Sequence, residues 1–140
     1  MVNIGVKKLD PEAQLPKMQR EGDAAFDVYA VENTILLPRL PKIVNCGIAL
    51  EIPSGFKVLI YGRSGLATKG IFAHIGTVDP NYKGMVGPIL INLTDLPYEI
   101  KKGDRVGQIV SVPIMPTEFT EVVELSESVR GSQGFGSSGR

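Results

Sequence analysis

The stretch KIVNCGIALEIPSGFKVLIYG, residues 42–62, contains the pattern that decides the expected fold. Two apolar runs rich in valine and isoleucine are separated by the turn-forming triplet Pro53-Ser54-Gly55. Further short runs of this kind, each bounded by turn-forming residues, are NIGVK, FDVYA, GPILINL, RVGQIVSV and EFTEVV. Because the 10 prolines and 16 glycines interrupt the chain every few residues, the sequence predicts many short strands and an all-β sandwich, jelly roll or barrel.

The bulk composition limits the possible partners. The chain has 140 residues, enough for one domain, and its 15 basic side chains balance its 15 acidic ones. A zero net charge argues against non-specific binding to a nucleic acid polymer or an anionic membrane. We find no apolar run long enough for a signal peptide or a membrane span. We interpret the single cysteine, Cys46, as a small buried side chain and expect a cytoplasmic, reducing compartment.

One segment departs from the strand pattern. In YGRSGLATKG, residues 61–70, Ser64 is a candidate helix N-cap and Gly70 a candidate left-handed C-cap, which predicts one short helix. Its start, Arg63-Ser64-Gly65, combines unpaired N–H groups with a serine hydroxyl and a glycine that permits close approach, a combination that suits a phosphate group. A simple capped turn is the alternative.

Two aspartates lie in settings that allow chemistry. Asp27 lies within the otherwise apolar strand of GDAAFDVYA, where an unpaired carboxylate is costly, and Asp79 lies before the turn of GTVDPNYKG. If a polyphosphate binds, Asp27 could contact Mg²⁺ through water and Asp79 could act as a general base. A hydrogen-bonded turn or cap is the ordinary alternative for each. Tyr82 could face a sugar or pack at a strand edge.

The segment KKGDRVGQIV, residues 101–110, contains a third polar site. Gln108 is an amide among valines and isoleucines and needs a hydrogen-bond partner. We interpret Asp104 and Arg105 as an ion pair that fixes a turn or a subunit contact. His74 is the only histidine, so a cysteine–histidine zinc site is not expected.

The last residues, RGSQGFGSSGR (130–140), have the composition of a flexible linker. A linker needs neither an aromatic ring nor an arginine at each end, so the alternative is a segment that orders on a ligand. We therefore divide the chain into a β domain, residues 1–128, and a C-terminal arm, residues 129–140.

The order of these motifs resembles that of a known family. GDAAFDVYA, GRSGLATKG, GTVDPNYKG, GDRVGQIV and RGSQGFGSSG are similar to the five ordered motifs of the trimeric dUTPases. The resemblance implies a jelly-roll (β-clip) subunit and a homotrimer with active sites shared between subunits. It also implies Mg²⁺-dependent hydrolysis of dUTP to dUMP and pyrophosphate, with water attacking the α-phosphorus.

The resemblance also implies residue roles. Asp79 corresponds to the catalytic aspartate that orders the attacking water, and Asp27 to the aspartate that holds the Mg–triphosphate through water. The expected substrate-binding residues are Arg63, Ser64, Gly65, Gly76, Val78, Tyr82, Gln108, Arg130, Phe135, Gly136, Ser137 and Ser138. The arm would close the site as a lid, with its aromatic ring over uracil and its polar groups near the γ-phosphate.

Some positions depart from the family pattern. Many relatives have an asparagine six residues before the third-motif aspartate that helps to recognise uracil, whereas this chain has Ala73. Base selectivity would then depend on backbone groups of the hairpin expected at residues 73–82. Asn81, Met85 and Gln133 also differ from common family residues but remove no catalytic group.

Two other functions remain open. The dCTP deaminases, including bifunctional forms, share this fold but need a catalytic glutamate shortly after the third motif, and MVGPILINLTD, residues 85–95, has none. A non-catalytic nucleotide-sensing regulator on the same fold is the second alternative. The presence of Asp27 and Asp79 favours the enzyme.

Overall fold

The computed structural model describes residues 1–139, which contain eleven short strands and one helix. In chain order these are β1 (Gly5–Lys8), β2 (Phe26–Tyr29), β3 (Thr34–Leu36), β4 (Lys42–Ile43), β5 (Ile48–Glu51), β6 (Phe56–Tyr61), α1 (Ser64–Ala67), β7 (Ile71–Ala73), β8 (Gly76–Val78), β9 (Ile89–Asn92), β10 (Tyr98–Ile100) and β11 (Arg105–Pro113). The expected mostly-β subunit with one short helix is confirmed.

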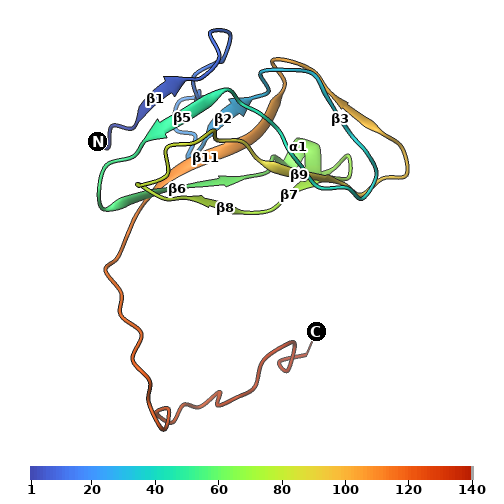
Figure 1. The fold of residues 1–140 in the computed structure, drawn as a ribbon. Helices are drawn as coiled ribbons and strands as arrows, with labels where there is room; N and C mark the ends of the chain where they lie inside the picture. The colour runs from blue at the N-terminus through green and yellow to red at the C-terminus, as the bar shows by residue number, and fades with distance from the viewer. Residues whose placement is uncertain (140) are drawn as a thin grey trace.

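The strands form four small antiparallel sheets (Figure 1). The largest has the order β2-β11-β6-β8, and a three-stranded sheet has the order β4-β9-β7. Two-stranded pairs, β1-β5 and β3-β10, complete the body. The longest strand, β11, lies between β2 and β6, so residues far apart in the sequence meet on the largest sheet.

The core lies between these sheets and consists of aliphatic side chains. Those buried most completely are Val28, Leu36, Val44, Ile48, Val58, Ile71, Leu90, Ile100 and Val106. The first run of the 42–62 stretch is split into β4 and β5, which pair with different strands. Gly47 turns the chain between them with a φ of 66°, and a side chain there would meet Ala13 and Val31 at 3.0 Å.

Two strand expectations were wrong. EFTEVV, residues 118–123, is not a strand, and Phe119 is fully exposed. The chain leaves the body after β11 and extends away from it (Figure 1), so this segment has no neighbouring strand with which to pair. The hairpin expected at residues 73–82 is also absent, because β7 pairs with β9 and β8 with β6.

The helix begins one residue earlier than expected from Ser64 as its N-cap. Arg63 is the N-cap, without a side-chain cap hydrogen bond, and Ser64 is the first helical residue. Gly70 is left-handed, with a φ of 83°, but it follows the C-cap residue Thr68 by two positions. No helix among residues 1–139 has the length and apolar character needed to cross a membrane.

Candidate functional site

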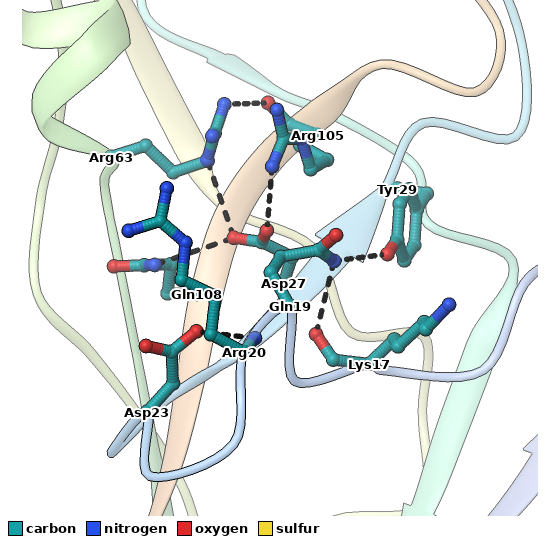
Figure 2. A network of polar contacts seen from close by, with 9 residues as sticks. All are labelled: Lys17, Gln19, Arg20, Asp23, Asp27, Tyr29, Arg63, Arg105 and Gln108. Carbon is teal, nitrogen blue, oxygen red and sulfur yellow. Dashed lines mark hydrogen bonds and ion pairs between the residues drawn. The ribbon is translucent and has the colours of Figure 1, made fainter.

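The carboxylate of Asp27 is the centre of a buried polar cluster (Figure 2). Asp27 is only 3% exposed. Arg63 Nε lies 3.3 Å from its Oδ1, and Arg105 Nη1 lies 3.4 Å from its Oδ2. Gln108 Nε2 donates to Oδ1 at 3.3 Å. The buried Asp27 carboxylate is therefore paired with two arginines, as its burial requires. The Gln108 amide has Asp27 as the hydrogen-bond partner that its apolar surroundings require.

The largest sheet brings this cluster together. Gln108 on β11 lies opposite both Asp27 on β2 and Tyr61 on β6, so the three residues form one row across three strands. Directly opposite residues share a face of a sheet. Arg63 follows β6 by two residues, and its Nη1 donates to the carbonyl oxygen of Arg105 at 3.3 Å.

Arg105 reaches the cluster through a β-bulge. Residues 105 and 108 are an odd number apart and would face opposite sides of a regular strand. The register of β11 against β2 shifts between Arg105 and Gly107, which turns the arginine towards Asp27. The expected pair between Asp104 and Arg105 is wrong, because the Asp104 carboxylate instead accepts a hydrogen bond from Lys101 N at 2.9 Å within the turn.

The segment before β2 covers the cluster. Asp27 and Lys17 exchange backbone hydrogen bonds of 2.9 and 3.1 Å. Gln19 Nε2 donates to the hydroxyl of Tyr29 at 2.8 Å. A pocket of about 350 Å³ lies here, lined by Gln19, Asp23, Ala24, Ala25, Asp27, Tyr61 and Gln108. We call it the Asp27 pocket.

The charges at this cluster suit an anion. Two guanidinium groups face one carboxylate, so one positive charge is left uncompensated within the cluster. The half-buried setting strengthens attraction to a phosphate relative to bulk water. Ser64 and Gly65 follow Arg63 directly at the start of α1 and are exposed, so their polar groups are accessible.

The donor set fits one kind of metal binding. Within the described part of the chain, no three His, Cys, Asp or Glu side chains are grouped to hold a metal ion. Asp27 and Asp23 both line the Asp27 pocket but belong to no such group. Mg²⁺ usually keeps several waters and binds through one or two carboxylates and substrate phosphates. The residues present therefore fit a hydrated Mg²⁺ that is bound together with a polyphosphate.

A second pocket contains the third-motif residues. It has a volume of about 300 Å³ and is lined by Ile43, Ile60, His74, Gly76, Thr77, Val78, Asp79, Tyr82, Met85, Val86, Gly87 and Ile89. We call it the Asp79 pocket. The exposed Asp79 carboxylate forms no hydrogen bond or ion pair with any residue from 1 to 139, which leaves both oxygens available to a ligand or water.

Tyr82 is held in place beside this aspartate. Its backbone N–H donates to the Asp79 carbonyl oxygen at 3.1 Å, and its hydroxyl donates to the Met85 carbonyl oxygen at 2.9 Å. A Cβ atom on Gly84 would lie 2.4 Å from that hydroxyl, so the ring position depends on glycine there. The aromatic ring is about half exposed and accessible for a flat or cyclic ligand.

The expected site residues thus fall into three separate groups within one chain. Asp27, Arg63 and Gln108 meet at one cluster, and Gly76, Val78, Asp79 and Tyr82 line a different pocket. The two pockets share no lining residue. Arg130, Phe135, Gly136, Ser137 and Ser138 are exposed on the extended segment, away from both.

Sequence reasoning missed Arg105 and Tyr61 as members of the Asp27 cluster and pocket. The signals for Arg105 were its place three residues before Gln108 on the same predicted strand and the isolated Gly107 between them, which can indicate a bulge. Without a bulge, regular alternation places the two side chains on opposite faces, so their spacing alone does not group them. Tyr61 gave no signal beyond its place at the end of an apolar run.

Comparison with known proteins gives consistent matches over the whole chain. The dUTPase family profile matches residues 11–139. The deoxyuridine 5'-triphosphate nucleotidohydrolase of Picosynechococcus sp. is 41% identical, with 99% of each chain covered. A structure of a Staphylococcus bacteriophage 80alpha dUTPase mutant with dUpNHpp is 29% identical, with a TM-score of 0.90 and 99% of each chain covered.

A third relative concerns the metal. The dUTPase of phage phi11 of S. aureus is 26% identical, with a TM-score of 0.79 over 87% of this chain and 97% of that one. A mutant of that enzyme revealed the coordination of a structural Mg(II) ion. Because the family profile spans nearly all of this sequence and a 41% identical relative matches it from end to end, the chain belongs to the dUTPase family.

Proposed function

We propose that this protein is a dUTP diphosphatase that hydrolyses dUTP to dUMP and pyrophosphate. The observation that carries the proposal is the free carboxylate of Asp79 beside the fixed ring of Tyr82, in a chain of the dUTPase family. A nucleotide needs a general base, a surface for the sugar and a cationic site for phosphates. The Asp79 pocket offers the first two, and the Asp27 cluster offers the third.

In the proposed reaction, water attacks the α-phosphorus and the bond to the pyrophosphate leaving group breaks. Asp79 accepts the proton of that water, for which an unpaired and accessible carboxylate is suited. Arg63, Ser64 and Gly65 bind the phosphate oxygens through charge-assisted and backbone hydrogen bonds. When bound, Mg²⁺ would offset the charge of the triphosphate, held by Asp27 through water with Gln108 beside it.

The nucleoside would lie in the Asp79 pocket. Tyr82 packs against the deoxyribose and leaves no space for a ribose 2′-hydroxyl. Gly76 and Val78 are buried residues of β8, so their backbone groups are the polar groups they can offer to the base. Apart from Asp79, His74 and Thr77, the rest of the pocket lining is apolar, which suits a flat pyrimidine.

We propose a homotrimer in which different subunits complete each site. Two observations support this assembly. The Asp27 and Asp79 pockets share no residue, although both would contact one nucleotide. Large apolar side chains are also exposed on the body, as expected of a surface that packs against other copies: Ile35, Leu37, Leu40, Ile43, Phe72, Leu93 and Leu96.

We propose that the C-terminal arm, residues 129–140, closes over bound nucleotide, separately from the β domain of residues 1–128. Phe135 is fully exposed, as expected for a ring that stacks on a base only when one is present. Arg130 Nε donates only to the nearby Gln133 carbonyl oxygen, at 2.6 Å, so its charge stays available for phosphate. Ser137, Ser138 and Gly136 would supply the remaining contacts. We place the protein in a reducing, intracellular compartment because its one cysteine is a buried thiol.

A nucleotide panel tests the activity. With Mg²⁺ present, dUTP, dTTP, dCTP and UTP are assayed for pyrophosphate and for the base of the product. The proposal expects pyrophosphate from dUTP far in excess of the others. A uracil product from dCTP would assign the chain to deamination instead, and tight dUTP binding without turnover would make it a sensor.

A further inference from the structure

His74 is a polar residue of the Asp79 pocket whose side chain has no role in the proposed reaction. It lies in the turn between β7 and β8 and lines the pocket together with Gly76. Its imidazole packs against Gly76, where an added Cβ would lie 3.2 Å from the Cε1 atom and 3.6 Å from Nε2. The His74 ring therefore forms part of the pocket wall next to Gly76.

The other polar side chains of this pocket are less suited to donate a hydrogen bond to a base. The Tyr82 hydroxyl donates to Met85, and the Asp79 carboxylate can only accept hydrogen bonds. Thr77 also lines the pocket, but it is the exposed residue of β8 between two buried ones, so alternation places its side chain on the opposite face of the strand from Gly76. Across residues 1–139 the His74 ring has no side-chain hydrogen bond, so a ring N–H is available to donate to a ligand.

We propose that His74 is a base-recognition residue that donates a ring N–H to the C4 carbonyl oxygen of uracil. This inference rests on the proposed function, because it takes the Asp79 pocket as the pyrimidine site. A donor at that position favours uracil, whereas the 4-amino group of cytosine would place two donors against each other. A site that hydrogen-bonds one partner discriminates because the wrong partner leaves a polar group unpaired.

Three variants separate hydrogen bonding from packing. His74→Phe keeps a planar ring but has no donor, His74→Gln keeps a donor without the ring, and Ile75→Val changes the adjacent exposed residue that does not line the pocket. The readouts are Kd values for dUMP, dCMP and pyrophosphate, together with KM and kcat for dUTP. These measurements distinguish base recognition from phosphate binding and from folding.

We expect His74→Phe to weaken dUMP binding about 3- to 10-fold, the loss of one hydrogen bond, with dCMP binding unchanged or tighter and pyrophosphate binding unchanged. KM for dUTP rises while kcat stays, and His74→Gln and Ile75→Val remain near wild type. Equal losses for dUMP, dCMP and pyrophosphate, or unchanged dUMP binding, would overturn the inference. A wild-type protein that binds dUMP but does not hydrolyse dUTP would refute the proposed function alone, since the binding comparison still tests His74.

Discussion

Replacing Asp27 with asparagine tests the polar cluster most severely. The substitution keeps the size of the side chain but removes the one carboxylate between two guanidinium groups. It also turns one accepting oxygen into an N–H donor that faces Arg63, Arg105 or Gln108. Two cations then remain close together without a counter-charge.

The cost follows from the burial of the partners. Breaking a fully buried ion pair costs about 3–5 kcal/mol because one charge is left unpaired. Here Asp27 is 3% exposed, but the side chains of Arg63 and Arg105 are 23% and 45% exposed, so water recovers part of the loss. We expect the unfolding free energy to fall by about 2–3 kcal/mol, a value between the costs of breaking an exposed ion pair and a fully buried one. For a chain of this size that corresponds to a fall in Tm of about 8–12 °C.

Urea unfolding provides the measurement, followed by far-UV circular dichroism because the chain has no tryptophan. The matched control is Glu12→Gln, which breaks the exposed ion pair between Glu12 and Lys102 and should cost at most about 1 kcal/mol. If Asp27→Asn lost no more stability than this control, the cluster would not depend on its carboxylate and the electrostatic reasoning would be wrong.

Three further predictions concern the arm, the Tyr82 ring and the buried thiol. Deleting residues 130–140 should lower kcat about 100-fold, as the removal of hydrogen-bond donors to the transition state does. Light scattering should show an intact assembly. Unchanged kinetics would mean that the segment is a flexible linker. Gly84→Ala should displace Tyr82 from its hydrogen bond and raise KM for dUTP about 5- to 10-fold, with UTP less strongly excluded; identical KM values would show that the ring tolerates the added methyl. Burial raises the pKa of the Cys46 thiol from 9.0 to about 12, so the native state retains a proton that the unfolded chain loses between these values. Stability should therefore be independent of this group below pH 9 and fall above it by about 1.4 kcal/mol per pH unit, and Cys46→Ala should abolish that slope in urea midpoints measured from pH 8 to 10.5.

The sequence predicted the elements whose local pattern and partners agree. The apolar run 56–61 became β6, and the run at 105–112 became β11, because both are central strands with neighbours inside the same chain. EFTEVV has the same residue types but no strand edge beside it, so its propensity alone did not produce a strand. Pairing partners are a long-range property that a local pattern does not contain.

The sequence indicated which residues belong to the site, but not which of them lie together in the fold. Asp27 and Gln108 needed partners on chemical grounds, and they proved to be each other's partners. The involvement of Arg105 depends on a one-residue bulge, for which the isolated Gly107 within the strand pattern was the available but unused signal. The separation of Asp79 from Asp27 follows from strand order, which places β8 at the edge of the largest sheet and β2 at its opposite edge.

Mixing two inactive variants tests most directly the claim that one dUTP site combines the Asp27 cluster of one subunit with the Asp79 pocket of another. Asp27→Asn and Asp79→Asn proteins are unfolded in urea, combined in equal amounts and refolded together, and dUTP hydrolysis is compared with each variant refolded alone. We expect each variant alone to fall well below wild type, with Asp79→Asn reduced about 10²- to 10⁴-fold by loss of its base. If two subunits supply the two aspartates, random mixing makes about one quarter of the sites intact and restores about one quarter of wild-type activity. Activity no higher than the average of the two separate variants would contradict the shared site and assign both aspartates to one chain.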